Sequence, residues 1–284
     1  MKHREIFRTA SLPVLQNKTY RTREEAVACP TGDIVLVQDE DSGLVFNAAF
    51  DPDSLSYDAE YQNEQACSGA FRRHLDDVTT VVERYFRERT LIEVGCGKGF
   101  FLEHLRQLGY SITGVDPAYE GDSANVLKAR FERGLGISAD GVVLRHVLEH
   151  VQDPVEFLSA ISRANGGCGL VYIEVPCFDW ICLNRAWFDI FYEHVNYFRK
   201  GDFFRMFGTV HEVGHLFGGQ YLYVVADLAT LRSPVADGDE CTLPPDFMRS
   251  IRYFAACAAT KGGKPRRAAS IPTSRQSGVP LPRE

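Results

Sequence analysis

The chain has 284 residues, of which 45% are hydrophobic, and a formal net charge of −7 at pH 7. This length suffices for one domain of ordinary to large size with appendages, and the apolar content supports a packed core. The negative charge argues against a nucleic-acid-binding surface, and no apolar run approaches the ~20 residues that a membrane helix needs. The eight cysteines are scattered without a Cys-x-x-Cys pair, and the first residues lead into no signal-peptide core. We therefore expect a cytoplasmic protein with reduced thiols.

Residues 1–67 show no strong helical period. Two short hydrophobic runs, at residues 33–38 and 43–46, are typical of strands, and an aromatic stretch with Tyr57 and Tyr61 follows them. We predict a small N-terminal segment of short strands and loops.

Helices and strands alternate from residue 68 to about residue 230. Ser68 is a suitable cap for a first helix, Gly109 ends a second helix, and Asp153 with Pro154 begins a later one. The hydrophobic runs that predict strands lie at about residues 90–94, 111–115, 141–147, 169–175, 209–217 and 221–228. A third strand and its helix, between residues 121 and 140, are poorly marked. This alternation predicts a doubly wound α/β fold with a mostly parallel sheet, closed by an antiparallel pair formed by the last two runs.

The first of these strands leads into a glycine-rich loop. Residues 91–99 read Leu-Ile-Glu-Val-Gly-Cys-Gly-Lys-Gly, and glycine tolerates both the tight turn and a ligand lying against the backbone. The next strand ends in Asp116, at the position where doubly wound folds bind a nucleoside ribose. Phe100 stands where a dinucleotide fingerprint requires its third glycine, and no phosphate-binding Gly-Lys-Ser/Thr follows. The alternative is a tight strand–helix turn that binds nothing.

The loop with its two acids resembles the first motif of class I S-adenosylmethionine-dependent methyltransferases. The resemblance implies a Rossmann-like sheet of seven strands and S-adenosylmethionine as the cofactor. Residues 144–154 also resemble the fourth-strand motif of these enzymes, which implies that His146 lies next to the cofactor. The residues implied to bind the cofactor are Glu93, Gly95, Cys96, Gly97 and Gly99 in the loop, Asp116 at the ribose, and His146.

An aromatic segment, residues 187–198, follows the fifth strand and contains Glu193 and His194. A carboxylate beside a histidine among aromatic rings is suited to acid–base chemistry, because the rings exclude water and the carboxylate orients the imidazole. The alternative is a loop whose histidine binds backbone carbonyls. Residues 192–198, Tyr-Glu-His-Val-Asn-Tyr-Phe, look like the signature of the sugar C-methyltransferases. This resemblance implies that His194 is the catalytic base and that Glu193 and Tyr192 belong to the catalytic set.

The likeness to the sugar C-methyltransferases extends into the N-terminal segment, whose tyrosines approach the active site in that family. Two departures stand out. The family's N-terminal module binds zinc through cysteine pairs, whereas residues 39–43 replace one pair here and Cys29 is the only cysteine nearby, so we expect no structural zinc and no other metal. The family also carries a second α/β domain, whereas residues 231–284 lose periodicity and end in a basic, proline-rich stretch. We expect these residues to form an irregular, disordered tail.

One further motif points to a different chemistry. Residues 211–215 match the His-Glu-x-x-His pattern of zinc proteases, which requires a helix. On the predicted strand, His211 and His215 would lie ~13 Å apart, too far for one zinc ion. We therefore expect surface histidines in a hairpin.

The sequence thus predicts three parts: an N-terminal segment (1–67), a cofactor-binding methyltransferase domain (68–230) and the tail (231–284). The predicted function is methyl transfer from S-adenosylmethionine to a small molecule, with carbon methylation of a sugar or related metabolite as the first interpretation. Two alternatives remain open: an O- or N-methyltransferase acting on another metabolite, and a cofactor-binding but inactive or regulatory partner. The expected partner is a small-molecule substrate, with no nucleic acid and no membrane, and the oligomeric state is undetermined.

Overall fold

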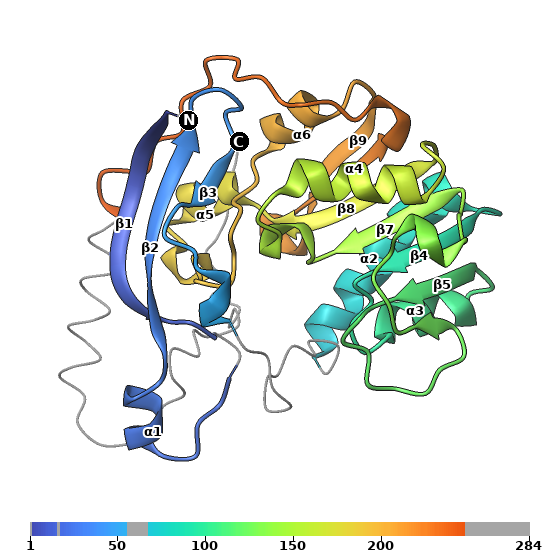
Figure 1. Ribbon diagram of the computed structural model, residues 1–284, viewed down its shortest axis with the longest axis horizontal. Helices are drawn as coiled ribbons and strands as arrows, with labels where there is room; N and C mark the ends of the chain where they lie inside the picture. The colour runs from blue at the N-terminus through green and yellow to red at the C-terminus, as the bar shows by residue number, and fades with distance from the viewer. Residues whose placement is uncertain (1, 16–17, 56–67, 248–284) are drawn as a thin grey trace, which may run out of the picture.

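The computed structural model describes residues 2–15, 18–55 and 68–247. Its strands are β1 (His3–Pro13), β2 (Thr31–Asp39), β3 (Val45–Asn47), β4 (Thr90–Val94), β5 (Ser111–Val115), β6 (Val126–Leu127), β7 (Gly141–Arg145), β8 (Leu170–Pro176), β9 (Val210–Leu216) and β10 (Tyr221–Asp227). Its α-helices are α1 (Arg23–Val27), α2 (Gly69–Phe86), α3 (Phe100–Gln107), α4 (Pro154–Ala164), α5 (Phe178–Asn184) and α6 (Lys200–Met206). The strands form two sheets, a small one at the left of Figure 1 and a large one at the right.

The large sheet has seven strands in the order β6-β5-β4-β7-β8-β10-β9. The first five pair in parallel, and β10 pairs antiparallel with both β8 and β9. Alternate residues of a strand face opposite sides. Val143 faces the cluster that contains α2 and α3, whereas Val142 and Leu144 face the cluster that contains α4 and α6. The predicted doubly wound, mostly parallel seven-stranded sheet is confirmed.

The helix ends form where the sequence signals lie. The Ser68 hydroxyl accepts a hydrogen bond from the Phe71 backbone at the start of α2. The Asp153 carboxylate accepts one from the backbone of Glu156 at the start of α4, with a proline at the first helical position. Gly109, just after α3, has a φ of +91°, a conformation that only glycine adopts without strain. The side chains of Ser68 and Asp153 thus accept hydrogen bonds from backbone N–H groups that the helix itself leaves unpaired, and the proline lacks such a group.

Four elements differ from the sequence-based expectations. The third strand, β6, has only two residues, and the described chain between it and β7 holds only a short 3₁₀ turn. Strand β7 ends at Arg145 because His146 adopts a left-handed φ of +52°. Strand β1 was not predicted, since charged residues interrupt its hydrophobic pattern; it lies at the sheet edge and its pairing with β2 contains register shifts. Helix α1 was also unexpected.

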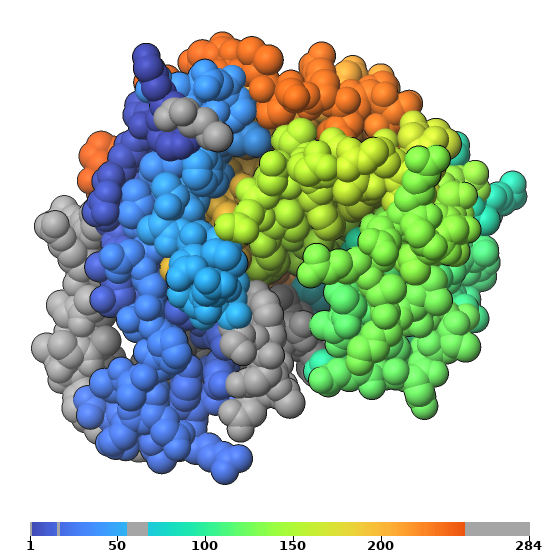
Figure 2. Space-filling model, in the orientation of Figure 1, coloured from blue at the N-terminus to red at the C-terminus, as the bar shows by residue number. Residues whose placement is uncertain are grey.

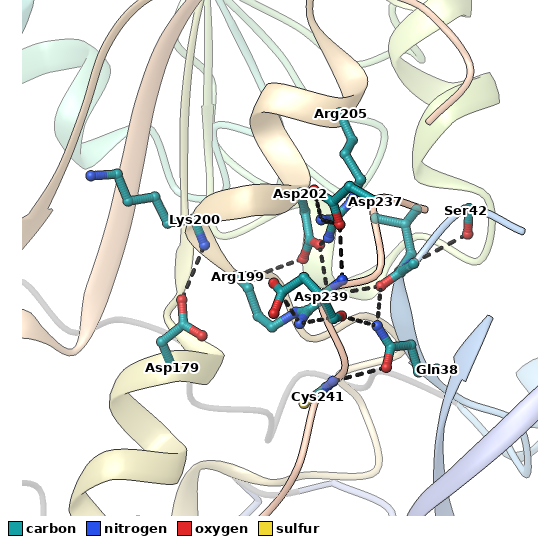
Figure 3. Close-up of polar contacts among 12 residues, drawn as sticks. Gln38, Ser42, Asp179, Arg199, Lys200, Asp202, Arg205, Asp237, Asp239 and Cys241 are labelled. Atoms are coloured by element: carbon teal, nitrogen blue, oxygen red, sulfur yellow. Dashed lines mark hydrogen bonds and ion pairs between the residues drawn. The ribbon is translucent and has the colours of Figure 1, made fainter. Parts of the chain in front are cut away.

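The residues after the last strand cross the molecule and connect its two parts. We call residues 232–247 the strap; in Figure 2 the orange residues of this part of the chain lie across the top of both lobes. Figure 3 shows two arginines near α6 that hold the strap. Arg205 pairs with Asp237 at 2.9 Å, and Arg199 pairs with Asp239 at 3.1 Å. Both arginines are buried and belong to the same unit as the large sheet.

The other side of the strap binds the small sheet. Gln38 on β2 donates a hydrogen bond to the carbonyl of Asp239 and accepts one from the backbone of Cys241, at 2.8 and 2.9 Å (Figure 3). At the end of the strap, Phe247 is buried and packs edge-on against Phe7 of β1. Residues 232–247 are irregular, but ion pairs and an aromatic contact fix them in place, so they do not show the disorder that we expected for the whole tail.

The basic, proline-rich stretch of the predicted tail, residues 261–284, lies outside the described residues. None of the helices in the described ranges combines the length and the hydrophobicity needed to cross a membrane.

Candidate active site

The glycine loop between β4 and α3 adopts a conformation that requires glycine. Gly95, Gly97 and Gly99 all have positive φ angles, of 74°, 55° and 77°. A Cβ atom on Gly95 would lie 2.5 Å from the side chain of Val147, whereas one on Gly97 would meet nothing within 4 Å. Packing therefore explains Gly95, and the loop leaves open space beside Gly97 where a ligand can approach the backbone.

Asp116 follows β5, the neighbour of β4, and closes the loop from the other side. One of its carboxylate oxygens accepts a hydrogen bond from the backbone of Gly97 and the other from the backbone of Ala118, each at 2.8 Å. Each oxygen retains a second lone pair. Asp116 thus fixes the loop and can still accept hydrogen bonds from a ligand.

Glu93 on β4 lies beneath the loop with only 3% of its surface exposed. Burial raises the pKa of its carboxyl to about 7, and the nearby Asp116 adds to the rise while Arg145 opposes it. Its Oε2 atom is buried and has no hydrogen-bond partner among the described residues. The Cys96 thiol is turned away from the loop opening, because it packs against Gly114 of β5. Cys96 therefore has only its backbone to offer to a ligand.

A buried polar network lies at the carboxyl ends of β7 and β8. Its centre is Glu174, which is fully buried and lies 3.0 Å from His74, 3.0 Å from His146 and 3.1 Å from Arg145. Tyr172 donates a hydrogen bond to the other carboxylate oxygen at 2.8 Å. Burial disfavours the charged carboxylate, but Arg145 and the two histidines outweigh it and hold the pKa of Glu174 well below its ordinary value.

The sequence reasoning missed this network. Its signal was a charged residue at the end of each buried strand, Arg145 on β7 and Glu174 on β8. Charged side chains are almost never fully buried unless they are paired. Two such residues on neighbouring strands would have predicted a buried ion pair at this edge of the sheet.

His146 joins this network to the turn that follows β7. Its Nδ1 atom lies 3.3 Å from Glu149 and its Nε2 atom 3.0 Å from Glu174, and its ring packs edge-on against Tyr221. Burial opposes a charge on the ring, but the carboxylates of the two nearby glutamates outweigh it and raise the pKa of His146 to about 9. The predicted cofactor-adjacent histidine therefore lies at the carboxyl edge of the sheet, where open α/β folds bind ligands.

Hydrogen bonds hold the segment with Glu193 and His194 against the same turn. The His150 ring donates from Nδ1 to the carbonyl of Glu193 at 2.9 Å. The backbone groups of Val195 and Asn196 both donate to the carbonyl of Glu149, at 2.7 and 3.0 Å. The turn after β7 and the segment after α5 thus form one unit, although they are more than 40 residues apart.

His194 is nearly buried, with 7% of its surface exposed. Its ring centre lies 4.4 Å from that of Phe191 and 4.9 Å from that of His150. Burial, and the repulsion that a charged His194 would meet from the neighbouring histidines, lower the pKa of His194 well below its ordinary value. The imidazole is therefore neutral at pH 7.

The structure does not bring Tyr192 to His194. The Tyr192 ring packs against Gly32 and Phe50, and its hydroxyl accepts a hydrogen bond from the backbone of Asp51 at 2.9 Å. A turn at residues 192–193 directs this side chain into the core of the small sheet. Tyr192 therefore packs in this core, and its place in the catalytic set stays a prediction.

The remaining residues that the sequence singled out lie at several places in the molecule. Glu193 is buried, and Tyr57 and Tyr61 lie outside the described residues. His211 and His215 lie on strand β9 and are exposed, as expected. The strand conformation excludes the zinc-protease interpretation.

Comparison with known proteins identifies the family. Residues 62–210, more than half of the chain, match the family described as a methyltransferase domain. The chain belongs to this family. Together with the strand order and the glycine loop, the match makes it a class I S-adenosylmethionine-dependent methyltransferase.

Relatives of this methyltransferase act on different atoms. The C-methyltransferase NovU of Streptomyces niveus is 30% identical over 135 residues, which cover 41% of this chain and 31% of that protein. A ubiquinone biosynthesis O-methyltransferase of Caulobacter vibrioides is 30% identical over 104 residues, covering 31% of this chain and 41% of that protein. The match thus spans well under half the length of these relatives. Among solved structures, the PH0226 protein from Pyrococcus horikoshii OT3 aligns with a TM-score of 0.47 and 13% identity, covering 61% of this chain and 99% of that one.

The residues of the loop fit the cofactor of this family. S-adenosylmethionine carries an ammonium group and two ribose hydroxyls, all of which donate hydrogen bonds. The methyltransferase offers a buried, unpartnered oxygen on Glu93, spare acceptor capacity on Asp116 and open space beside Gly97. Hydrogen-bond acceptors and room for a ligand therefore occur together at the carboxyl edge of the sheet.

Proposed function

We propose that this methyltransferase transfers the methyl group of S-adenosylmethionine to a small molecule that binds beside His194. The observation that carries the proposal is the open glycine loop, which Asp116 holds in place at the edge of the sheet. The cofactor supplies an electrophilic methyl group on its sulfonium. The chain has to bind both molecules, align them and exclude water.

Asp116 and Glu93 would hold the cofactor, with Asp116 at the ribose and Glu93 at the methionine part. The acceptor would lie toward the turn after β7, where Glu149 lies 3.3 Å from His146 and is grouped with His194 in a largely buried setting. The methyl group would pass from the sulfonium sulfur to the acceptor atom, and the acceptor would give up one proton in the reaction.

His194 is our candidate for the group that takes this proton. Its neutral ring has a nitrogen lone pair available, and Phe191 and Tyr197 surround it. The carbonyl of Glu193, which accepts the hydrogen bond of His150, fixes the backbone next to the ring. A base at this place supports carbon methylation of a sugar or related metabolite, because a carbon next to a ketone must lose a proton before it can attack.

The second candidate is O- or N-methylation of another metabolite. The similarity to an O-methyltransferase over 104 residues favours this candidate. A phenol or an amine is acidic or nucleophilic enough to react with little help from a base. An inactive, cofactor-binding partner remains the third possibility.

Two measurements test the proposal. Calorimetry should show that the protein binds S-adenosylmethionine and does not bind NAD. Transfer of a labelled methyl group should then be measured across a panel of keto sugars, phenols and amines, for the wild type, for His194→Ala and for His211→Ala as an exposed histidine control. Carbon methylation that depends on His194 supports the first candidate. Methylation of oxygen or nitrogen without such dependence supports the second, and binding without turnover on any substrate supports an inactive partner.

A further inference from the structure

A second set of side chains lies beside the proposed acceptor site. Glu149 and His150 come from the turn after β7, and His194 comes from the segment after α5. Each offers one ligand atom, and these three atoms all lie within 4.8 Å of one another. Glu149 and His194 are buried, whereas His150 is partly exposed.

The tautomer of His150 suits a metal ligand. Its Nδ1–H donates to the carbonyl of Glu193 at 2.9 Å, so its Nε2 atom carries the lone pair. A hydrogen bond from the distal ring nitrogen to a carbonyl or carboxylate accompanies nearly all metal-binding histidines, because it fixes the ring and increases its basicity. The ring of His194 lies edge-on to the ring of His150, with 4.9 Å between their centres.

Glu149 provides the observation that points to a missing partner. Only 1% of its surface is exposed, and its Oε2 atom has no hydrogen-bond partner among the described residues. Its other oxygen lies 3.3 Å from His146. A buried carboxylate oxygen without a partner is costly, and a cation bound between Glu149 and the two histidines would remove that cost.

In contrast to the sequence-based expectation of no metal, we propose that Glu149, His150 and His194 bind one divalent transition-metal cation of the zinc and cobalt class. Two imidazoles and one carboxylate suit this class, and three protein ligands leave a fourth position open. The donors of a tetrahedral zinc site are about 3.4 Å apart, so side-chain movements of about 1 Å would close the shell. The partly exposed His150 provides a route of entry.

The bound cation would change what the proposed active site can do. A lone pair of His194 that binds the metal cannot accept a proton from the acceptor. Metal-free and metal-bound enzyme would therefore differ in chemistry, with base catalysis confined to the metal-free form. This consequence rests on the proposed role of His194, whereas the binding site itself does not.

Cobalt provides the direct test, since protein-bound Co²⁺ absorbs visible light and needs no substrate. The full chain, stripped of metal with a chelator and dialysed, should bind one Co²⁺ in absorbance and calorimetric titrations. Glu149→Gln and His150→Ala should each weaken binding by about tenfold or more. The exposed histidines of β9 provide matched controls, so His211→Ala and His215→Ala should bind as the wild type does.

The outcomes separate clearly. Absence of stoichiometric Co²⁺ binding overturns the metal site, and so does binding that neither Glu149→Gln nor His150→Ala weakens, or that His211→Ala abolishes. Glu149→Gln keeps the size and shape of the side chain, and far-UV circular dichroism of each variant identifies any that fails to fold. S-adenosylmethionine binding is measured on the same samples. Protein that binds the cofactor but not Co²⁺ refutes only the metal site, whereas protein that binds Co²⁺ but not the cofactor refutes only the proposed function.

Discussion

Replacing Glu93 by glutamine should change how the stability of this methyltransferase depends on pH. The carboxyl is 3% exposed, and burial raises its pKa from an ordinary value of 4.5 to about 7 in the folded protein. In the unfolded chain it ionises near its ordinary value. Between these two values the folded state holds a proton that the unfolded state has lost, so the free energy of unfolding falls as the pH rises through this range.

The size of the effect follows from the two pKa values. A rise from 4.5 to about 7 corresponds to about 3 kcal/mol in full. Of this, about 2.5 kcal/mol develops between pH 5 and pH 8. Glutamine is neutral throughout and has nearly the same shape. The unfolding free energy of Glu93→Gln relative to wild type should therefore be higher at pH 8 than at pH 5 by about 2.5 kcal/mol.

Urea unfolding without cofactor, followed by circular dichroism at both pH values, measures this difference. Glu120→Gln is the control, because Glu120 is exposed and its carboxylate stays in water in both states. Buried acids that do not interact with Glu93 titrate equally in wild type and variant, so the comparison reports on Glu93 and its interaction with Asp116. If the stability difference between Glu93→Gln and wild type is the same at pH 5 and pH 8, the reasoning about this buried carboxyl is wrong.

Three further predictions concern the cofactor loop and the base. Asp116→Ala should weaken S-adenosylmethionine binding by about 1–3 kcal/mol in calorimetry, because it removes the carboxylate that accepts hydrogen bonds from the loop and would accept them from the ligand. Unchanged affinity would show that the ribose binds elsewhere. Gly95→Ala should lower the unfolding free energy by about 1–3 kcal/mol, because the new Cβ atom would lie 2.5 Å from the side chain of Val147. Gly97→Ala should cost less stability but should weaken cofactor binding. If urea unfolding finds the two variants equally stable, the packing argument is wrong. His194→Ala should slow methyl transfer by ~10²–10⁴-fold without changing cofactor affinity, with Glu193→Gln in between, and a wild-type rate would exclude His194 as the base.

Local signals were enough to predict most of the large sheet. Strands β4 and β5 lie where the hydrophobic runs predicted them, and the caps of α2 and α4 form at Ser68 and Asp153. In each case a periodic pattern and a boundary residue agree within a few positions. Strand β1 carries no such pattern, because its exposed edge tolerates charged residues.

The site was harder to predict, because it depends on directions and distant contacts. The glycine loop and Asp116 could be named since both follow directly from strand ends. The direction of Tyr192 could not, because a turn next to it sends the ring toward the small sheet. Likewise, the pairing of Glu149 and His150 with the segment around His194 joins residues more than 40 positions apart, which no local period reports.

The strap constrains the order in which the two sheets can fold during synthesis. Gln38 completes its hydrogen bonds only with residues that lie 201 and 203 positions later. At synthesis rates of 5–20 residues per second, the small sheet must wait roughly 10–40 s on the ribosome for these partners. The large sheet lies between them in sequence and can fold first. The earliest residues to be made would thus be among the last to reach their final packing, and a chaperone that shields β2 during this interval would increase the yield of folded enzyme.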